Sequence, residues 1–531
     1  MEAKATTTFA SDPRTSCVLV RITGECPASL RTTLPFYSIS RTGRTTISVS
    51  GIVIGANRSQ IRILCNASAL SLFNKNDIGI VAVLPGHPDP VDCRLDAVGR
   101  VSCVDDAFRA IMEQTIGWTV GWRYASSSND AVNNLMSPAA LAVVTADVSQ
   151  PAGVRPVTLG RSGDHGQDVY AVSSPFGLFC PAVMQNGVSK GVVGNTIRPG
   201  CLQTIDARCL PGSEGGGVFC TDGNLVGVVT IPLRRADQTD TTAVNMMMSV
   251  EAIAGFLSRH RCLPPMTRPA AGRPRSNLTD RLTLATRSVV PICLDRSWAS
   301  AVIIHSDGYL VTNAHLLIPS GATEPGPVPG LRVRLDGSNF LHGNKQGRRW
   351  AQASVVYCSS GPWDLALVHI DQDELVSVSE GIGWSFAPPR PGTSVAAVGH
   401  ALFDPSVECT PAGPSVSRGT LAKVGRIRGG EPVLLQSSAL VHRGNSGGML
   451  LDVDAGRAIG VVSCNIRQSL PGGADRDSAT IPSLNFSIPA RIIADLITYI
   501  HARDDRILAE LNKDDEAIRN LWLLKSPQAR L

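Results

Sequence analysis

Short apolar runs separated by turn residues recur along the second half of the chain. Residues 301–304 (Ala-Val-Ile-Ile) are apolar, residues 306–308 (Ser-Asp-Gly) favour a turn, and residues 309–311 resume the apolar pattern. A further apolar run covers residues 365–368. Apolar runs of this length bounded by turn residues are typical of β-strands. The pattern, together with 50 glycines and 35 prolines, predicts a turn-rich all-β protein.

Three residues with catalytic potential follow or precede these runs. His315 comes shortly after one predicted strand, Asp364 stands at the head of another, and Ser446 lies in the Gly-Asn-Ser-Gly-Gly run of residues 444–448. Each alone fits a bland role: a core histidine, a strand-capping aspartate and a turn serine. The order His, Asp, Ser is the chain order of the chymotrypsin class. We therefore expect Ser446 to be the nucleophile, His315 its general base, and Asp364 the group that orients the imidazole.

The glycines around Ser446 predict a second catalytic feature. They allow a tight turn in which the backbone N–H groups of Gly444 and Ser446 point into one pocket. Two such donors would bind the oxyanion of an acyl-transfer intermediate. The same run is therefore a candidate oxyanion hole.

Four segments of the second half together resemble Deg/HtrA-type trypsin-like serine proteases. They are residues 312–315 (Thr-Asn-Ala-His), 364–366 (Asp-Leu-Ala), 444–448, and 485–489 (Asn-Phe-Ser-Ile-Pro). The resemblance covers residues 285–500 and implies a chymotrypsin-like double β-barrel with the triad named above. Most of these proteases carry a PDZ domain after the catalytic domain. Here the segment after residue 489 is too short for one.

That C-terminal segment predicts helix instead. Apolar residues stand at helical spacing at positions 492, 493, 496, 497 and 500. We therefore expect a helical tail.

The first half of the chain repeats the protease pattern without its chemistry. Ser68 aligns with the histidine, Ala140 with the aspartate and Glu214 with the nucleophile, while the glycines around Glu214 are kept. Several such matches in the same order indicate two modules of one fold, of which the first is degenerate and inactive.

These patterns predict four parts of the chain. Residues 1–258 form the degenerate module, and residues 259–284, rich in proline and arginine, form an exposed linker. Residues 285–500 form the active protease domain, and residues 501–531 the helical tail.

Charge and cysteine content exclude several other classes of function. The net charge of +5 (49 Lys+Arg against 44 Asp+Glu) is too dilute for nucleic-acid binding. The 14 cysteines show no metal-ligand spacing, and a serine protease requires no cofactor, so we expect neither metal nor cofactor. No run approaches the roughly 18 apolar residues of a membrane span. Without an apolar signal region at the N-terminus, reduced thiols in an intracellular compartment are expected.

The final tripeptide, Ala529-Arg530-Leu531, is a conservative variant of the Ser-Lys-Leu peroxisomal address. Together with the protease motifs, it makes the chain look like the Deg/HtrA relatives that lack a PDZ domain and process proteins in peroxisomes. That resemblance implies location in the peroxisomal matrix and recognition by the peroxisomal import receptor. It also implies removal of N-terminal presequences from imported proteins, cleavage of other peroxisomal enzymes and of itself, and a homo-oligomer.

Two alternatives remain open at this point. One is a general quality-control Deg/HtrA protease of another compartment, in which the final tripeptide is accidental. The other is a binding scaffold with a silent triad.

Specificity is expected to exclude basic residues. The residue six positions before the serine, Leu440, would form the base of the specificity pocket, and Ser463 and Cys464 its wall. An apolar floor leaves a lysine or arginine unpaired, which is costly, so a small or apolar residue such as cysteine is favoured. Alternatively, Leu440 packs in the core.

Overall fold

A computed structural model covers the chain, and most of it can be described. The described residues are 12–25, 38–40, 43–73, 77–87, 89–114, 118–121, 137–148, 153–235, 244–266, 277–340, 348–373, 375–379, 381–402, 404–406, 413–427, 430–469 and 478–522. The final tripeptide and much of the predicted linker lie outside them.

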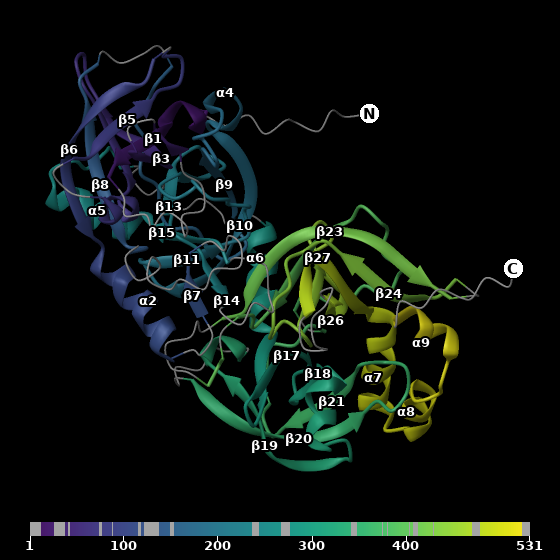
Figure 1. Ribbon diagram of the computed structural model, residues 1–531. Coiled ribbons are helices and arrows are strands. Elements are labelled where there is room, and N and C mark those ends of the chain that lie inside the picture. The colour runs from purple at the N-terminus through teal and green to yellow at the C-terminus, as the bar shows by residue number, and fades with distance from the viewer. Residues whose placement is uncertain are drawn as a thin grey trace, which may run out of the picture. The chain divides into compact units, whose positions relative to one another are not determined.

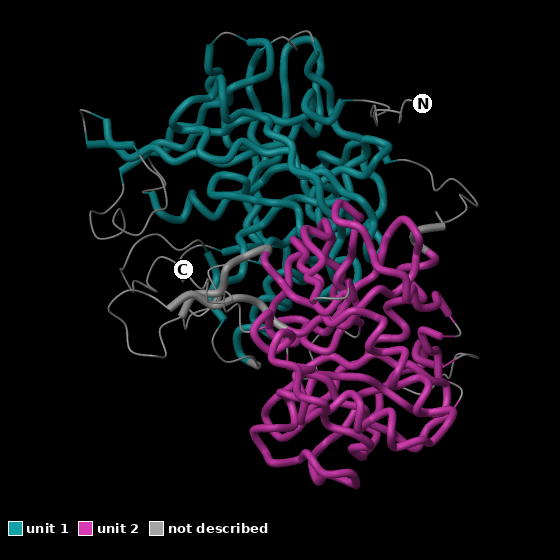
Figure 2. The backbone as a smooth tube through the Cα atoms, turned by 90° about the vertical axis from the view of Figure 1, so that its right-hand side faces the viewer, with its two compact units in different colours: residues 1–273 teal, residues 274–531 magenta. Residues whose placement is uncertain are grey.

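The chain divides into two compact units, residues 1–273 and 274–531 (Figure 2). The division falls within the segment predicted as a linker. That prediction extended too far, because helix α6 (Asn277–Arg287) occupies its last residues. Leu282 of this helix is buried, so residues 277–284 belong to the second unit and are not an exposed linker.

The first sheet of unit 1 is closed by pairing of β1 with β3, in the order β1-β5-β6-β8-β4-β3, with β2 beside β3 (Figure 1). Alternate residues of β1, namely Val18, Val20 and Ile22, enter one core, as a strand's two-residue period requires. The strands are β1 (Cys17–Gly24), β2 (Ser38–Ile39), β3 (Thr45–Ala56), β4 (Ile61–Asn66), β5 (Gly79–Val83), β6 (Val91–Arg100) and β8 (Ala140–Ala146).

A second closed barrel completes unit 1, in the order β10-β11-β15-β13-β12-β9. Its strands are β9 (Asp168–Ser173), β10 (Gly187–Arg198), β11 (Leu202–Ile205), β12 (Gly217–Cys220), β13 (Leu225–Val229) and β15 (Met246–Ser249). Other elements are helices α2 (Ser102–Gln114), α4 (Pro181–Met184) and α5 (Val250–Arg259), and the pair β7 (Trp118–Val120) and β14 (Leu233–Arg235).

Unit 2 repeats this plan with two closed barrels, β16-β17-β18-β21-β20-β19 and β22-β23-β24-β27-β26-β25. The first contains β16 (Val289–Leu294), β17 (Ser297–His305), β18 (Tyr309–Thr312), β19 (Gly326–Leu335), β20 (Arg349–Cys358) and β21 (Ala366–Ile370). The second contains β22 (Ser394–Gly399), β23 (Ser415–Arg426), β24 (Pro432–Ser437), β25 (Met449–Asp452), β26 (Arg457–Ser469) and β27 (Ser478–Pro489). Tandem double barrels confirm the predicted fold class.

Three helices follow the last barrel: α7 (Ala490–Ala502), α8 (Asp505–Leu511) and α9 (Glu516–Trp522). The predicted helical C-terminal segment is confirmed, but the predicted boundary between the protease domain and the tail is wrong. A division between residues 500 and 501 cuts α7, which packs against β26 and β27 and buries Ile493, Leu496 and Ile500. The helix is therefore part of the protease unit.

Candidate active site

His315 is held by Asp364 through both its backbone and its ring. It lies in the 3₁₀ helix η3 (Ala314–Leu316), directly after β18, while Asp364 precedes β21, the strand paired with β18. The His315 N–H donates to Asp364 Oδ1 at 2.9 Å, and His315 Nδ1 lies 2.7 Å from Asp364 Oδ2. The ring contact is a hydrogen bond in which an Nδ1 proton is donated to the carboxylate. Nε2 is then the ring atom left to accept a proton.

Two further contacts hold Asp364, one at its carboxylate and one at its backbone carbonyl. Ser463 Oγ donates to Asp364 Oδ2 at 2.8 Å, and Asn313 Nδ2 donates to the Asp364 carbonyl at 2.8 Å. Sequence reasoning placed Ser463 in the wall of the specificity pocket and missed this bond. The available signal was its position near the end of the apolar run 459–462, which passes the site in the fold.

The turn of Ser446 is tied to the same region. The N–H of Gly447 donates to Val462 O at 2.8 Å, so the turn lies beside Ser463, the residue bonded to Asp364. The N–H of Ser300 donates to Ser446 O at 2.8 Å. Gly447 has a φ of +80°, and a Cβ there would lie 2.0 Å from Ser300 O, so the position requires glycine.

The nucleophile and the base are not hydrogen-bonded in the described part of the chain: no such bond joins Ser446 Oγ to His315. In ligand-free sites such contacts are often long and tighten only when substrate binds. The structure therefore brings Asp364 onto His315 and the Ser446 turn beside them.

Two backbone N–H groups of the Ser446 turn make no hydrogen bond within the described residues. Among the residues with described positions, neither Gly444 N–H nor Ser446 N–H donates to any acceptor, whereas Asn445 N–H between them donates to His442 O at 3.0 Å. These are the two donors expected to form an oxyanion hole.

Opposing effects set the pKa values of the His–Asp pair. Burial lowers the pKa of His315, but the hydrogen bond and charge of Asp364 outweigh it, so the net shift is upward from 6.5. Burial raises the pKa of Asp364, but bonding to His315, its charge and the Ser463 hydroxyl bring it below 3.8. The pair is thus arranged to stabilise a protonated imidazole beside a carboxylate.

The predicted specificity residues occupy different surroundings. Leu440 is half-buried, and its N–H donates to Ser417 Oγ at 2.8 Å. The Ser463 hydroxyl is turned to Asp364, while the side chain of Cys464 lies outside the described atoms. The role of Leu440 as the floor of a specificity pocket stays a prediction.

Strand register shows where unit 1 lost its chemistry. Ser50 N–H donates to Glu214 O at 2.9 Å, as Ser300 N–H does to Ser446 O, so Glu214 stands at the nucleophile position. Continuing the β3–β4 and β17–β18 registers by one or two residues pairs Ser50 with Asn66 and Ser300 with Asn313. Ser68 and His315, each two residues after these asparagines, therefore occupy equivalent positions. The same reasoning along the next strand pair makes Ala140 the equivalent of Asp364.

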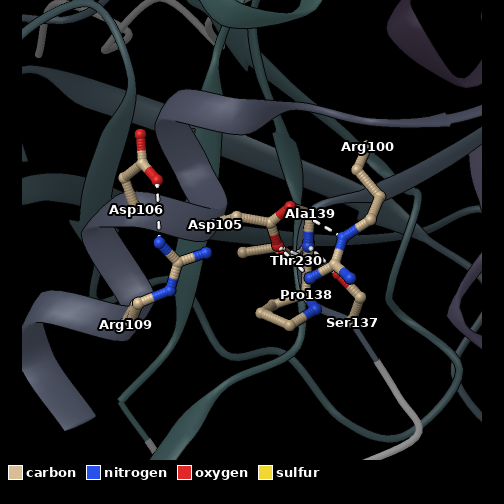
Figure 3. A network of polar contacts seen from close by, with 8 residues as sticks. All are labelled: Arg100, Asp105, Asp106, Arg109, Ser137, Pro138, Ala139 and Thr230. Carbon is tan, nitrogen blue, oxygen red and sulfur yellow. Dashed lines mark hydrogen bonds and ion pairs between the residues drawn. The ribbon is translucent and has the colours of Figure 1, made fainter. Parts of the chain in front are cut away.

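Other polar contacts lie near these positions in unit 1. Thr230, the equivalent of Ser463, donates to Pro138 O instead of a carboxylate (Figure 3). Near it, Ser137 Oγ donates to Asp105 Oδ1 at 3.2 Å, and Arg100 pairs with Asp105 at 2.6 Å. These polar groups bond to one another, and the described residues of this region include no histidine–carboxylate pair.

Family comparison agrees with this architecture. A family model described as a trypsin-like peptidase domain matches residues 49–228 and 299–461, one segment in each unit and more than half of the chain. The chain therefore belongs to the trypsin-like peptidase family.

Individual proteins are also similar to this chain. The peroxisomal leader peptide-processing protease of Mus musculus is 32% identical over 68% of this chain and 60% of the relative. That of Homo sapiens is 30% identical over 68% of this chain and 61% of the relative. Serine endoprotease DegS of Haemophilus influenzae is 30% identical over 39% of this chain and 51% of the relative. The chain thus spans about three fifths of the length of its first two relatives.

Two features are absent from the described residues. No group of three or more histidine, cysteine or acidic side chains there could hold a metal ion. No described helix is both long enough and apolar enough to cross a membrane.

Proposed function

We propose that this protein is a serine endopeptidase of the peroxisomal matrix that removes N-terminal targeting presequences from imported proteins. The observation that carries the activity is the two-point bonding of His315 to Asp364 beside a serine turn with two unoccupied N–H donors. The names of the two peroxisomal relatives support the compartment and the substrate class.

The chemistry proceeds through an acyl-enzyme. Ser446 Oγ attacks the scissile carbonyl and passes its proton to His315 Nε2, while Asp364 stabilises the imidazolium. The N–H groups of Gly444 and Ser446 bind the oxyanion, and His315 returns the proton to the leaving amine. Water then attacks the acyl-enzyme with His315 again as base, which releases the new C-terminus and restores Ser446.

Substrate choice is assigned to Leu440. A half-buried apolar floor accepts a small or apolar side chain before the scissile bond, cysteine included, and leaves a buried lysine or arginine without a counterion. Replacing Leu440 with aspartate should therefore shift cleavage toward basic residues.

Two further partners belong to this proposal. Ala529-Arg530-Leu531 is assigned to the peroxisomal import receptor, so its deletion should abolish import. A homo-oligomer is assigned by resemblance to Deg/HtrA proteases, and measurement of the mass in solution tests it.

The decisive experiment compares the wild-type protein with Ser446→Ala. Each is incubated with a purified peroxisomal protein that carries its presequence, and new N-termini are mapped by mass. Wild type should generate one defined N-terminus and Ser446→Ala none. Equal cleavage by both proteins would remove Ser446 from its role, and no cleavage by either would refute the proposed substrate.

A further inference from the structure

The Arg443–Gly444 peptide group supplies one of the two donors of the candidate oxyanion hole. The N–H of Gly444 belongs to the peptide that joins Arg443 to Gly444, and the carbonyl of that peptide accepts a hydrogen bond from Leu402 N–H at 2.9 Å. Because the C=O and N–H of a planar trans peptide point in opposite directions, a contact that fixes the carbonyl also fixes the N–H. The Leu402 bond therefore aims the Gly444 donor.

Leu402 makes this bond from an unfavourable backbone conformation. Its φ is +76°, in the left-handed region, where residues other than glycine are strained. The residue is buried, 8% exposed. Strained residues of this kind persist where surrounding structure holds them, and they concentrate at functional sites.

Unit 1 contains the same arrangement, and there a carboxylate accepts a hydrogen bond from the equivalent N–H group. Phe176 also has a positive φ, +52°, and its N–H donates to Pro211 O at 2.9 Å. The next N–H, that of Gly212, donates to Glu214 Oε2 at 2.8 Å. A peptide held in this way thus presents its N–H to a carboxylate oxygen. In unit 2 the equivalent donor, Gly444 N–H, has no hydrogen-bond acceptor among the described residues.

Close packing in unit 2 opposes rotation of the peptide. Ser300 Oγ donates to Gly444 O at 2.7 Å, and a Cβ at position 444 would lie 2.3 Å from His400 O and 2.5 Å from Trp298 Nε1. The Arg443 guanidinium lies over the Trp298 ring, 4.6 Å from its centroid. Both sides of the peptide are therefore held.

We infer that Leu402 is a positioning residue for catalysis: its left-handed backbone directs its N–H to Arg443 O and keeps Gly444 N–H turned toward the oxyanion. This rests on the proposed function. The left-handed backbone, rather than the apolar side chain, is what the site requires of position 402.

Two substitutions separate these requirements. Leu402→Gly removes the side chain but favours positive φ, whereas Leu402→Val keeps apolar bulk but strongly resists it. Loss of one oxyanion donor lowers kcat by about 100- to 1,000-fold, so partial misplacement in Leu402→Val should lower kcat about tenfold or more. KM should change less than about twofold, and Leu402→Gly should keep kcat within about threefold of wild type.

The assay measures kcat, KM and the affinity of a peptide aldehyde, which forms a tetrahedral adduct with Ser446. Aldehyde affinity should fall in parallel with kcat in Leu402→Val, while the affinity of the matching peptide amide stays constant. If Leu402→Val does not fold, Leu402→Ala replaces it and should be less active than Leu402→Gly. A valine or alanine variant more active than the glycine variant overturns the inference. Absence of Ser446-dependent cleavage by wild type would refute the proposed function instead.

Discussion

At the scale of single residues, the His315–Asp364 pair predicts how activity depends on pH. His315 must be neutral to accept the Ser446 proton, and its pKa is raised above 6.5, so the acid limb of kcat/KM should lie above pH 6.5. In Asp364→Asn the carboxylate is lost while burial remains, and burial lowers the pKa of His315. The limb should then move to lower pH, while the plateau falls about 10⁴-fold. A limb that moves to higher pH would contradict this account.

Ser463 gives a second prediction at this scale. Its hydroxyl donates to Asp364 Oδ2 and lowers the pKa of that carboxyl, so Ser463→Ala weakens the support of the ion pair that forms during acylation. A hydrogen bond to a charged group contributes about 1.5–3 kcal/mol, so kcat/KM should fall at least about tenfold. Ser463→Thr, which keeps a hydroxyl, is the control and should retain most activity. Equal kinetics for wild type and Ser463→Ala would show that this bond is dispensable.

The candidate triad could be predicted from sequence because its residues stand at fixed places relative to apolar runs. The chain order His315, Asp364, Ser446 was enough to expect their grouping, and in the structure His315 follows and Asp364 precedes two strands that pair with each other. Ser463 and Leu402 could not be assigned in the same way. The role of Ser463 depends on where β26 passes Asp364, and that of Leu402 depends on a backbone angle, which no local residue pattern specifies.

At the scale of elements, helix α7 is predicted to contribute to the stability of the protease unit. Leu496 is fully buried where the helix packs against the last barrel. Leu496→Ala should lower the free energy of unfolding of unit 2 by about 2–5 kcal/mol, through lost burial and the cavity left behind. Thr498→Ala, on the exposed side of the same helix, should change it by no more than about 0.5 kcal/mol. Thermal or urea unfolding measures both, and equal effects would mean that α7 does not support the barrel.

Helical spacing predicted this helix correctly but placed its domain boundary wrongly. Periodicity shows which residues share a face, and Ile493, Leu496 and Ile500 do share the buried one. It does not identify the surface that the face covers. The linker boundary was misplaced for a related reason, because the start of α6 follows a proline- and arginine-rich stretch whose composition hides it.

At the scale of the whole molecule, one fold occurs twice with opposite states of the same turn. In unit 2 the N–H groups of Gly444 and Ser446 donate to no acceptor among the described residues, whereas in unit 1 the carboxylate of Glu214, a buried residue, accepts from Gly212 N–H. Glu214 thus replaces the nucleophile and also closes the donor site. We therefore expect the unit-1 turn to be a structural element and the proposed peptide cleavage to reside in unit 2.

Glu214→Ala and Ser446→Ala should therefore have opposite effects. Removing the Glu214 carboxylate leaves the part-buried Gly212 N–H without its partner, which should destabilise unit 1 by about 1 kcal/mol while cleavage continues within about twofold of wild type. Ser446→Ala should abolish cleavage and leave both unfolding transitions unchanged. Calorimetry and the presequence assay together measure both outcomes. Loss of cleavage in Glu214→Ala, with unit 2 still folded, would mean that the degenerate unit takes part in catalysis.

Adding Glu214→Ser to Ser446→Ala should restore no cleavage, because Ser68 and Ala140 supply neither a base nor a carboxylate.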